Sequence, residues 1–433
     1  MTRTRMNLAL MVGPLVICAI VHAGGANADD DPEAAAKALL RPVCAAQAAR
    51  DRIVAKMIEE GGEYERATAK WDMDMACEQI DLSVTPLHDT ADPAADASHS
   101  DWIYDAAWSP DGTRIVTAGR DKSVRIWDVA TGKTVKRFDM ASYNTAGPAG
   151  QPSIAEQLKT PSAPAPSDNI SMARHARFLD GGRSIVVAAD GHPVRVIDVE
   201  TGASILDIPY ASADKSWTMP PDIDVTPSGL VVIGGYKGEH VVYDTVSKSE
   251  RYRLPALEND YPVFKAWEPS GLLVTTKPAG ERSVSIEMRK LDSGALIWQA
   301  VAEGSRSADN LAFSRDGTQL VAAVQGVAYI YDVASGALRN KFTVYPTFGT
   351  FTVAFTADGK RLVAGVRHAQ LWDIATGKRL HHFGPFGDLC HSVDVSPDGR
   401  YLVTSHIGSD ARIWEIETGT FFRRLGKNVH PPG

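Results

Sequence analysis

The sequence predicts an all-β fold: a seven-bladed β-propeller of four-stranded antiparallel blades, preceded by a short α-helical hairpin. Two observations support the propeller. A unit of short strands and glycine-containing turns recurs along most of the chain. The length of 433 residues is too great for one ordinary core but suits a large repeat architecture. The unit is clearest at residues 109–133, with the sequence SPDGTRIVTAGRDKSVRIWDVATGK.

Each copy of the unit starts with an apolar strand and a turn that contains glycine, often beside aspartate. These turn glycines are Gly112, Gly182, Gly229, Gly271, Gly317, Gly359 and Gly399. A β-branched run follows each of them, such as RIVTA, SIVVAA or LVVIGG. In most copies a third run then ends in an aromatic or aliphatic residue and an acid, before a second glycine turn and a last strand. The terminal pairs are Trp127-Asp128, Ile197-Asp198, Tyr243-Asp244, Tyr331-Asp332, Trp372-Asp373 and Trp414-Glu415.

A period of about 40–47 residues with four short strands indicates one propeller blade per repeat. One such sheet leaves both faces bare, whereas seven around an axis bury these faces against one another. The predicted organisation is a signal peptide at 1–28, a helical hairpin at 29–80, a linker at 81–98, the propeller at 99–426 and a tail at 427–433. A Pro-rich insertion at 139–169 lengthens one step of the repeat.

The period and the Trp-Asp ending resemble those of the WD-repeat family of β-propellers, and the resemblance covers about residues 99–426. The first blade matches best. The resemblance implies that His99, Thr117, Asp121 and Trp127 form a structural hydrogen-bonded tetrad. Other blades depart from the pattern: Ile197 replaces the tryptophan in blade two, blade four lacks the Trp-Asp pair, and blade seven has Phe386 where the histidine would fall.

The resemblance also implies a binding surface on the rim shared by the loops that enter each blade and the turns between its two middle strands. In the family this rim commonly binds peptides and proteins. Residues carried over to it are Trp102, Tyr104, Arg120, Tyr236, Lys237, Arg306, Arg367, His368 and His406. Trp, Tyr and Arg dominate the energetics of protein interfaces. We therefore expect a protein-interaction scaffold, with the helical hairpin as an alternative binding part.

The first 28 residues are expected to direct export. Arg3 and Arg5 precede an apolar run from about Leu8 to Val21, and small residues before Asp29 form an A-x-A cleavage site. A periplasmic or secreted location follows, without stable membrane insertion once the segment is removed. An uncleaved anchor is the alternative, although the apolar run is short for a bilayer span of about 20 residues.

Cysteine positions predict one disulfide. Cys44 and Cys77 lie at nearly equal distances from Gly61-Gly62, which joins two helix-forming segments. In an antiparallel hairpin both would lie about 24 Å from the turn, at the same height. We expect a bridge, with two free buried thiols as the alternative. Cys390 has no obvious partner and is expected to be a small buried hydrophobe.

Catalytic motifs are absent from the sequence: there is no HExxH, CxxC, GxSxG or phosphate-binding glycine loop. The aspartates of the glycine turns are expected to serve backbone geometry. A net charge of −8 excludes an electrostatic preference for nucleic acid. No cofactor and no metal site are predicted, and the chain is not expected to be an enzyme. The alternative is a periplasmic enzyme with a metal or quinone site in the central channel.

Overall fold

The computed structural model describes the propeller and little of the N-terminal region. The described residues are 51–52, 54–55, 98–144, 172–190, 192–208, 210, 222–235, 239–255, 263–345, 352–365, 368–383, 389–407 and 409–425. The chain divides into two compact units, Met1–Thr90 with Pro385–Gly387, and Ala91–Gly384 with Asp388–Gly433. All the described strands belong to the second unit, to which the rest of the description applies.

Seven four-stranded antiparallel sheets form the second unit over its described residues, which confirms the predicted architecture. Blade 1 contains β1 (Ile103–Trp108), β2 (Arg114–Gly119), β3 (Ser123–Asp128) and β4 (Thr134–Asp139). Blade 2 contains β5 (Ala173–Leu179), β6 (Ser184–Ala189), β7 (Val194–Asp198) and β8 (Ser204–Ile208). Blade 3 contains β9 (Asp222–Val225), β10 (Leu230–Gly234), β11 (His240–Asp244) and β12 (Ser249–Leu254).

The remaining blades follow in the same order. Blade 4 contains β13 (Phe264–Trp267), β14 (Leu272–Gly280), β15 (Ser283–Lys290) and β16 (Leu296–Glu303). Blade 5 contains β17 (Asn310–Phe313), β18 (Gln319–Val324), β19 (Val327–Asp332) and β20 (Leu338–Thr343). Blade 6 contains β21 (Thr352–Phe355), β22 (Arg361–Gly365), β23 (Ala369–Asp373) and β24 (Lys378–Phe383). Blade 7 contains β25 (Cys390–Val395), β26 (Tyr401–His406), β27 (Ala411–Glu415) and β28 (Phe421–Leu425).

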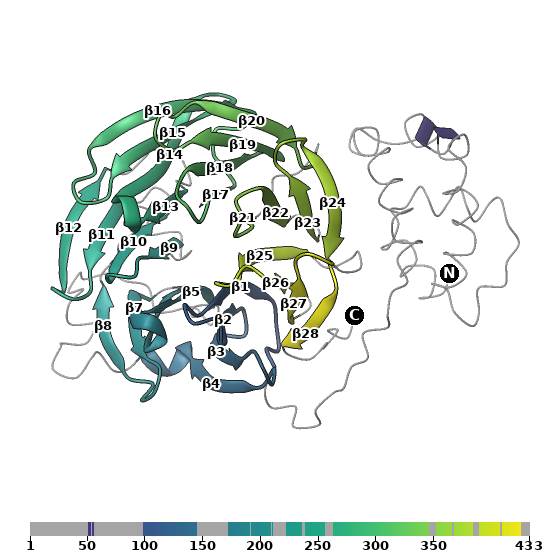
Figure 1. Ribbon diagram of the computed structural model, residues 1–433. Helices are drawn as coiled ribbons and strands as arrows, with labels where there is room; N and C mark the ends of the chain where they lie inside the picture. The colour runs from purple at the N-terminus through teal and green to yellow at the C-terminus, as the bar shows by residue number, and fades with distance from the viewer. Residues whose placement is uncertain are drawn as a thin grey trace, which may run out of the picture. The chain divides into compact units, whose positions relative to one another are not determined.

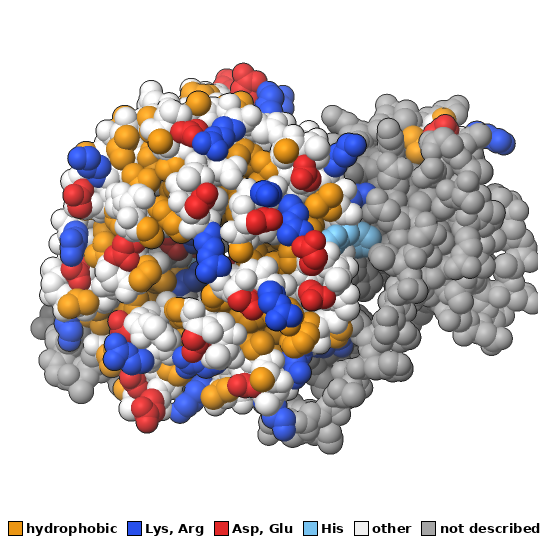
Figure 2. Space-filling model, viewed as in Figure 1, with side chains coloured by type: hydrophobic (Ala, Val, Ile, Leu, Met, Phe, Trp, Pro, Cys, Tyr) orange, Lys and Arg blue, Asp and Glu red, His pale blue; other side chains and the backbone are white. Residues whose placement is uncertain are grey.

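The first strand of every blade lies nearest the centre of the ring and the fourth lies at the periphery (Figure 1). Because successive strands are antiparallel, the first strand begins, the second ends, the third begins and the fourth ends on one side. We call this side the upper rim. On the face in Figure 2, Lys and Arg side chains stand around the hollow at the centre of the ring.

The middle strands read as continuous apolar runs because both faces of each sheet are buried between neighbouring blades. All six side chains of β6 are buried, and five of the six in β2. Between blades 1 and 2, Val116 and Ile126 pack with Phe178 and Ile185 in one hydrophobic cluster. Comparable clusters join blades 2 and 3, 3 and 4, 4 and 5, 6 and 7, and 7 and 1.

Ring closure needs no strand exchanged between the chain ends, because blades 7 and 1 each own four strands. Polar bonds join their inner strands instead. The backbone N–H of Ala106 donates to Ser392 Oγ at 2.9 Å, and that of Trp108 donates to Asp394 Oδ2 at 2.9 Å. The Trp108 indole also donates to the Asp394 carbonyl at 3.1 Å. Side chains of blade 7 therefore satisfy backbone donors of blade 1 at the seam.

Glycine-turn aspartates hold their own turns, as predicted. Asp111 Oδ1 accepts hydrogen bonds from Ser109 Oγ at 2.5 Å and from the Thr113 N–H at 3.0 Å. The same bond from a Ser or Thr hydroxyl reaches Asp316, Asp358 and Asp398. Gly112, which lies between Asp111 and Thr113, has a φ of +70°, which L-residues rarely adopt.

Several predictions made from the sequence fall outside the described residues. They are the signal peptide, the linker at 81–98 apart from its last residue, the tail, residues 145–169 of the insertion and both Cys44 and Cys77. The helical hairpin at 29–80 gains no support, since only residues 51–52 and 54–55 of it are described. Cys390 is a free, buried thiol. Among the described residues, no helix is long and apolar enough to cross a membrane.

Candidate functional site

The four tetrad residues of blade 1 are joined by hydrogen bonds. The Trp127 indole donates to Thr117 Oγ1 at 2.8 Å, Thr117 Oγ1 lies 2.7 Å from His99 Nε2, and His99 Nδ1 lies 2.8 Å from Asp121 Oδ1. His99 is fully buried, and burial lowers its pKa despite the Asp121 hydrogen bond. A neutral ring then donates from Nδ1 to the carboxylate and accepts the Thr117 hydroxyl at Nε2. This chain of hydrogen bonds joins the loop before β1 to strands β2 and β3 at the upper end of blade 1.

Blades 6 and 7 reach a similar arrangement from different residues. In blade 7 the Trp414 indole donates to Thr404 Oγ1 at 2.9 Å, and Thr404 Oγ1 lies 2.7 Å from His406 Nε2. In blade 6 His368 contacts Gln370 at 2.9 Å. His406 is the last residue of β26 and His368 directly precedes β23, and both are buried, at 2% and 1% exposure. They were expected on the binding surface, whereas in the structure both side chains are buried within their blades.

Three neighbouring inner strands carry a β-bulge near their upper ends. The register shifts between Ile103 and Asp105 in β1, between Ala173 and His175 in β5, and between Cys390 and Ser392 in β25. The bulged residues are Tyr104, Arg174 and His391. The inner strands β9, β13, β17 and β21 pair without a shift. Bulges re-aim a side chain and are frequent beside functional sites.

The bulged side chains meet one another across two blade boundaries. The Arg174 guanidinium lies 4.3 Å from the centre of the Tyr104 ring, in cation–π geometry. On the other side, the His391 ring packs edge-on against Tyr104 with centroids 5.5 Å apart. Arg174 is also paired with Asp190 at 3.2 Å. A continuous row from blade 2 through blade 1 to blade 7 results.

Two further residues extend this row. Trp102 lies just before β1, and its ring centroid is 6.1 Å from that of His391. Arg120, in the turn after β2, lies 5.0 Å from the Trp102 ring centre. We call Trp102, Tyr104, Arg120, Arg174 and His391 the rim cluster. Arg120 is 43% exposed and only loosely paired with Asp101, at 3.7 Å.

Electrostatics leave the rim cluster with neutral rings between two cations. Burial raises the pKa of Tyr104, so its hydroxyl stays protonated. Burial, assisted by the charge of Arg174, lowers the pKa of His391, so the imidazole is neutral at pH 7. Burial raises the pKa of Asp190, the partner of Arg174. The aromatic faces and guanidinium planes can stack against apolar groups, and the N–H groups of the guanidinium and of the neutral imidazole can donate hydrogen bonds to carboxylates or carbonyls.

Buried polar contacts beneath the rim cluster hold the inner strands in place. The Ala176 N–H of β5 donates to Asp105 Oδ2 of β1 at 3.2 Å, and Arg177 forms an ion pair with the same carboxylate. Although burial alone would raise the pKa of Asp105, Arg177 and His175 lower it. His175 bridges further to Asp222 in blade 3, at 3.5 Å. These contacts join β1, β5 and β9 and so fix the positions of two of the strands that carry the rim cluster.

The remaining predicted rim residues lie elsewhere or cannot be placed. Arg306 is exposed in the loop between blades 4 and 5, away from the rim cluster along the ring. Tyr236, Lys237 and Arg367 lie outside the described residues. The structure thus brings together three of the predicted residues, Trp102, Tyr104 and Arg120. Arg174 and His391, which lie beside these residues, were not predicted for the rim, and comparison of IYD, ARH and CHS at equivalent strand starts was the signal that could have found them.

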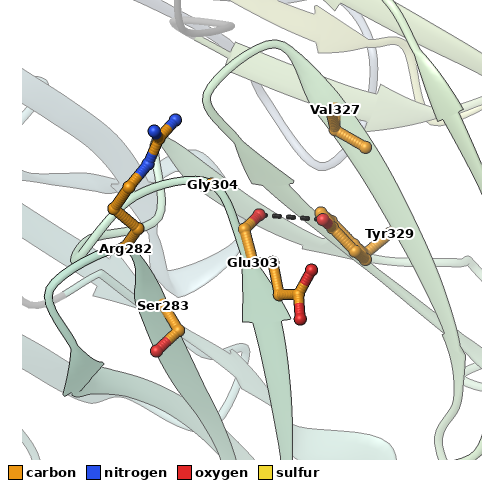
Figure 3. Close-up of a pocket in the computed structure, with 6 residues that line it drawn as sticks. All are labelled: Arg282, Ser283, Glu303, Gly304, Val327 and Tyr329. Carbon is orange, nitrogen blue, oxygen red and sulfur yellow. Dashed lines mark hydrogen bonds between the residues drawn. The ribbon is translucent and has the colours of Figure 1, made fainter.

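An open groove of about 580 Å³ lies farther along the upper rim, between blades 4 and 5 (Figure 3). It is lined by Arg282, Ser283, Glu303, Gly304, Val327 and Tyr329. The Tyr329 hydroxyl donates to the Glu303 carbonyl at 2.8 Å and so joins the two blades at the groove. Over the described residues, no group of three or more His, Cys, Asp or Glu side chains is arranged to hold a metal ion.

Comparison with known proteins finds repeats of one kind. The model of the WD domain, G-beta repeat, matches residues 96–128 and 377–415. WD repeat-containing protein 1 of Xenopus tropicalis is 22% identical over 346 residues, which cover 74% of this chain and 54% of that protein. Autophagy-related protein 16 of Arabidopsis thaliana is 24% identical over 184 residues, or 42% of this chain and 35% of that protein. The chain thus spans about half or less of the length of these relatives.

Proposed function

We propose that this chain, a WD-repeat β-propeller, is a non-enzymatic interaction module that binds a protein or peptide partner at the rim cluster. The three adjacent bulges carry the proposal. The bulges bring Tyr104, Arg174 and His391 together at the upper ends of three neighbouring inner strands. The repeat pattern itself does not require a bulge at this position. The first strands of the other four blades pair with their neighbours without such bulges, so the bulges are not a general feature of these blades.

The chemistry of the rim cluster suits an extended segment with an acidic side chain beside an apolar one. Arg120 is the more accessible of the two arginines, since its side chain is 43% exposed against 22% for Arg174, and its acid partner is 3.7 Å away, beyond hydrogen-bond distance. An incoming carboxylate can pair with it while an apolar group stacks on Trp102 or Tyr104. Interfaces centred on Trp, Tyr and Arg concentrate their binding energy in a few such residues.

We also propose that the chain is exported. The basic start, apolar run and A-x-A site of residues 1–28 support secretion of the propeller to the periplasm or the medium. In such an oxidising compartment Cys44 and Cys77 would form the proposed bridge. Non-reducing peptide mapping of the exported protein should link the two cysteine peptides, and free thiols at both positions would disprove the bridge.

The proposed binding site is tested by affinity capture with the full chain. Wild type and Arg120→Glu are compared with Arg306→Glu, a matched charge reversal at an exposed arginine on the same rim. Arg120→Glu should lose the captured partner because like charges then face its acidic residue, and Arg306→Glu should retain it. Unchanged capture by Arg120→Glu would move the site away from the rim cluster.

A further inference from the structure

The outer strands of the seven blades differ in how they protect their unpaired edges. Such an edge offers free N–H and C=O groups to other chains, and proteins guard it with charge, especially Lys, or by keeping the strand short. Strands β4, β12, β20, β24 and β28 each carry at least two Lys or Arg residues, and the five-residue β8 carries Asp207. Strand β16, LIWQAVAE, is the longest of the seven and has no charge before its last residue, Glu303.

Apolar side chains of β16 are also the most exposed group on any outer strand described here. Leu296, Ile297 and Val301 are 50%, 46% and 58% exposed. A hydrogen bond joins this strand to the neighbouring blade: the Trp298 indole donates to the Val333 carbonyl of blade 5 at 2.8 Å. A long strand that carries no charge before Glu303 and exposes Leu296, Ile297 and Val301 therefore lies at the periphery of the ring, where Figure 1 shows the strand.

Hydrogen bonding to β15 shows which residues of β16 point their backbone groups outwards. The Gly304 N–H donates to the Arg282 carbonyl at 2.8 Å, and the register pairs Ala302 with Val284 and Ala300 with Ile286. Because bonded and non-bonded residues alternate in an antiparallel ladder, Gln299 and Val301 turn their N–H and C=O groups to the free edge. The Glu303 carbonyl also points away from β15, where it accepts the Tyr329 hydroxyl (Figure 3).

We propose that β16 pairs with β16 of a second copy of this chain, antiparallel about a two-fold axis at Ala300. Gln299 of each copy then faces Val301 of the other, and each such pair exchanges two backbone hydrogen bonds. This use of the edge is independent of the rim cluster. It closes the assembly at a dimer, because an isologous contact uses up both edges.

Charge favours a second copy as the occupant. The stretch from Leu296 to Ala302 carries no charged side chain, so self-pairing places no like charges opposite each other along this part of the ladder. The two Glu303 carboxylates lie at opposite ends of the paired strands. Each is placed at the end of the other copy's strand where the exposed Lys290 stands on β15. Self-pairing of β12 or β28 would instead bring arginines together.

The test is the mass of the full chain in solution by sedimentation equilibrium across a range of concentrations. Wild type should show a reversible dimer, whereas Val301→Lys should sediment as a monomer, because a buried edge lysine opposes pairing. Leu338→Lys is the matched control, since Leu338 is 48% exposed on β20, and it should dimerise like wild type. Thermal melting confirms that both variants are folded. A monomeric wild type at every concentration, or a dimer unaffected by Val301→Lys, overturns the proposal.

Discussion

Single residues in this propeller act mainly by satisfying buried polar groups. Thr117 shows this best, because its hydroxyl accepts from the Trp127 indole and contacts His99 Nε2 with no exposure to solvent. Such residues could be predicted from sequence, since the tetrad in blade 1 keeps the residue types of the WD-repeat family that the sequence resembles. His368 and His406 could not, because their burial depends on whether the imidazole turns back into the blade, which spacing along the chain does not determine.

Replacing Thr117 by valine should destabilise the fold. The side chain keeps its shape but leaves the Trp127 and His99 ring nitrogens without a partner, and each buried unsatisfied group costs about 1–3 kcal/mol. We expect the free energy of unfolding in urea to fall by about 2–4 kcal/mol. Thr343→Val, at an exposed position on β20, should change it by less than about 0.5 kcal/mol. Equal effects of the two substitutions would contradict the structural role of the tetrad.

His240 should make stability depend on pH. Burial, with a smaller contribution from Arg289, lowers its pKa to about 4, and its Nε2 is buried without a hydrogen-bond partner. In the unfolded chain the imidazole titrates near 6.5. Between these values the unfolded state binds a proton that the folded state does not, so stability is complete above pH 6.5 and is lost as pH falls towards 4.

The measurement is the free energy of unfolding of wild type and His240→Phe at several pH values between 6.5 and 4. Removing this one group should make the decline shallower by about 1.4 kcal/mol per pH unit. His192, whose pKa is also lowered to about 4 by burial, remains in both proteins, so a residual slope is expected. Parallel curves for the two proteins would show that His240 is protonated to the same extent in both states.

At the scale of elements, the repeat specifies strands and turns, and departures from it specify the site. The alternation of short strands and glycine turns predicts each blade from sequence. The bulges at Tyr104, Arg174 and His391 are not part of this repeat pattern: aligning the strand starts IYD, ARH and CHS shows that the three residues are equivalent, but the register shift itself depends on how two strands pair. This is why Arg174 and His391 were missed although both neighbours in blade 1 were predicted.

Equivalent turn glycines should tolerate alanine differently. Gly271 and Gly399 occupy the same turn in blades 4 and 7, with φ of +62° and +76°. A Cβ at Gly271 meets nothing within 4 Å, whereas one at Gly399 would lie 2.3 Å from the Ala357 side chain. Gly271→Ala should cost about 1–2 kcal/mol for the left-handed backbone alone. Gly399→Ala should cost a further 1–3 kcal/mol or so, because the blade 6–blade 7 contact must give way.

Urea denaturation of the two variants measures this difference directly. Because the backbone cost is nearly common to both, subtraction isolates the steric contact between blades. Equal destabilisation by the two substitutions would mean that blade 6 yields freely to an extra methyl group beside Ala357, and would contradict close packing at that boundary.

At the scale of the whole molecule, we propose that the closed ring holds three blades together so that a partner can bind at the rim cluster. The ring was predictable because each repeat forms a sheet with two apolar faces, and seven such sheets bury these faces against one another when they are arranged around an axis. The identity of the displayed surface was only half predictable, since Trp102, Tyr104 and Arg120 come from one blade and their neighbours from two others. Contacts between blades form only when the ring closes, so the sequence of a single repeat does not reveal them.

Site-specific photocrosslinking tests this claim most directly. A benzophenone side chain is placed at Trp102, in the rim cluster, or at Val246, which is 76% exposed in the turn between β11 and β12 on the other rim. Irradiation with the captured partner should give a crosslinked product from position 102 and none from position 246. A product from position 246 alone would contradict binding at the rim cluster.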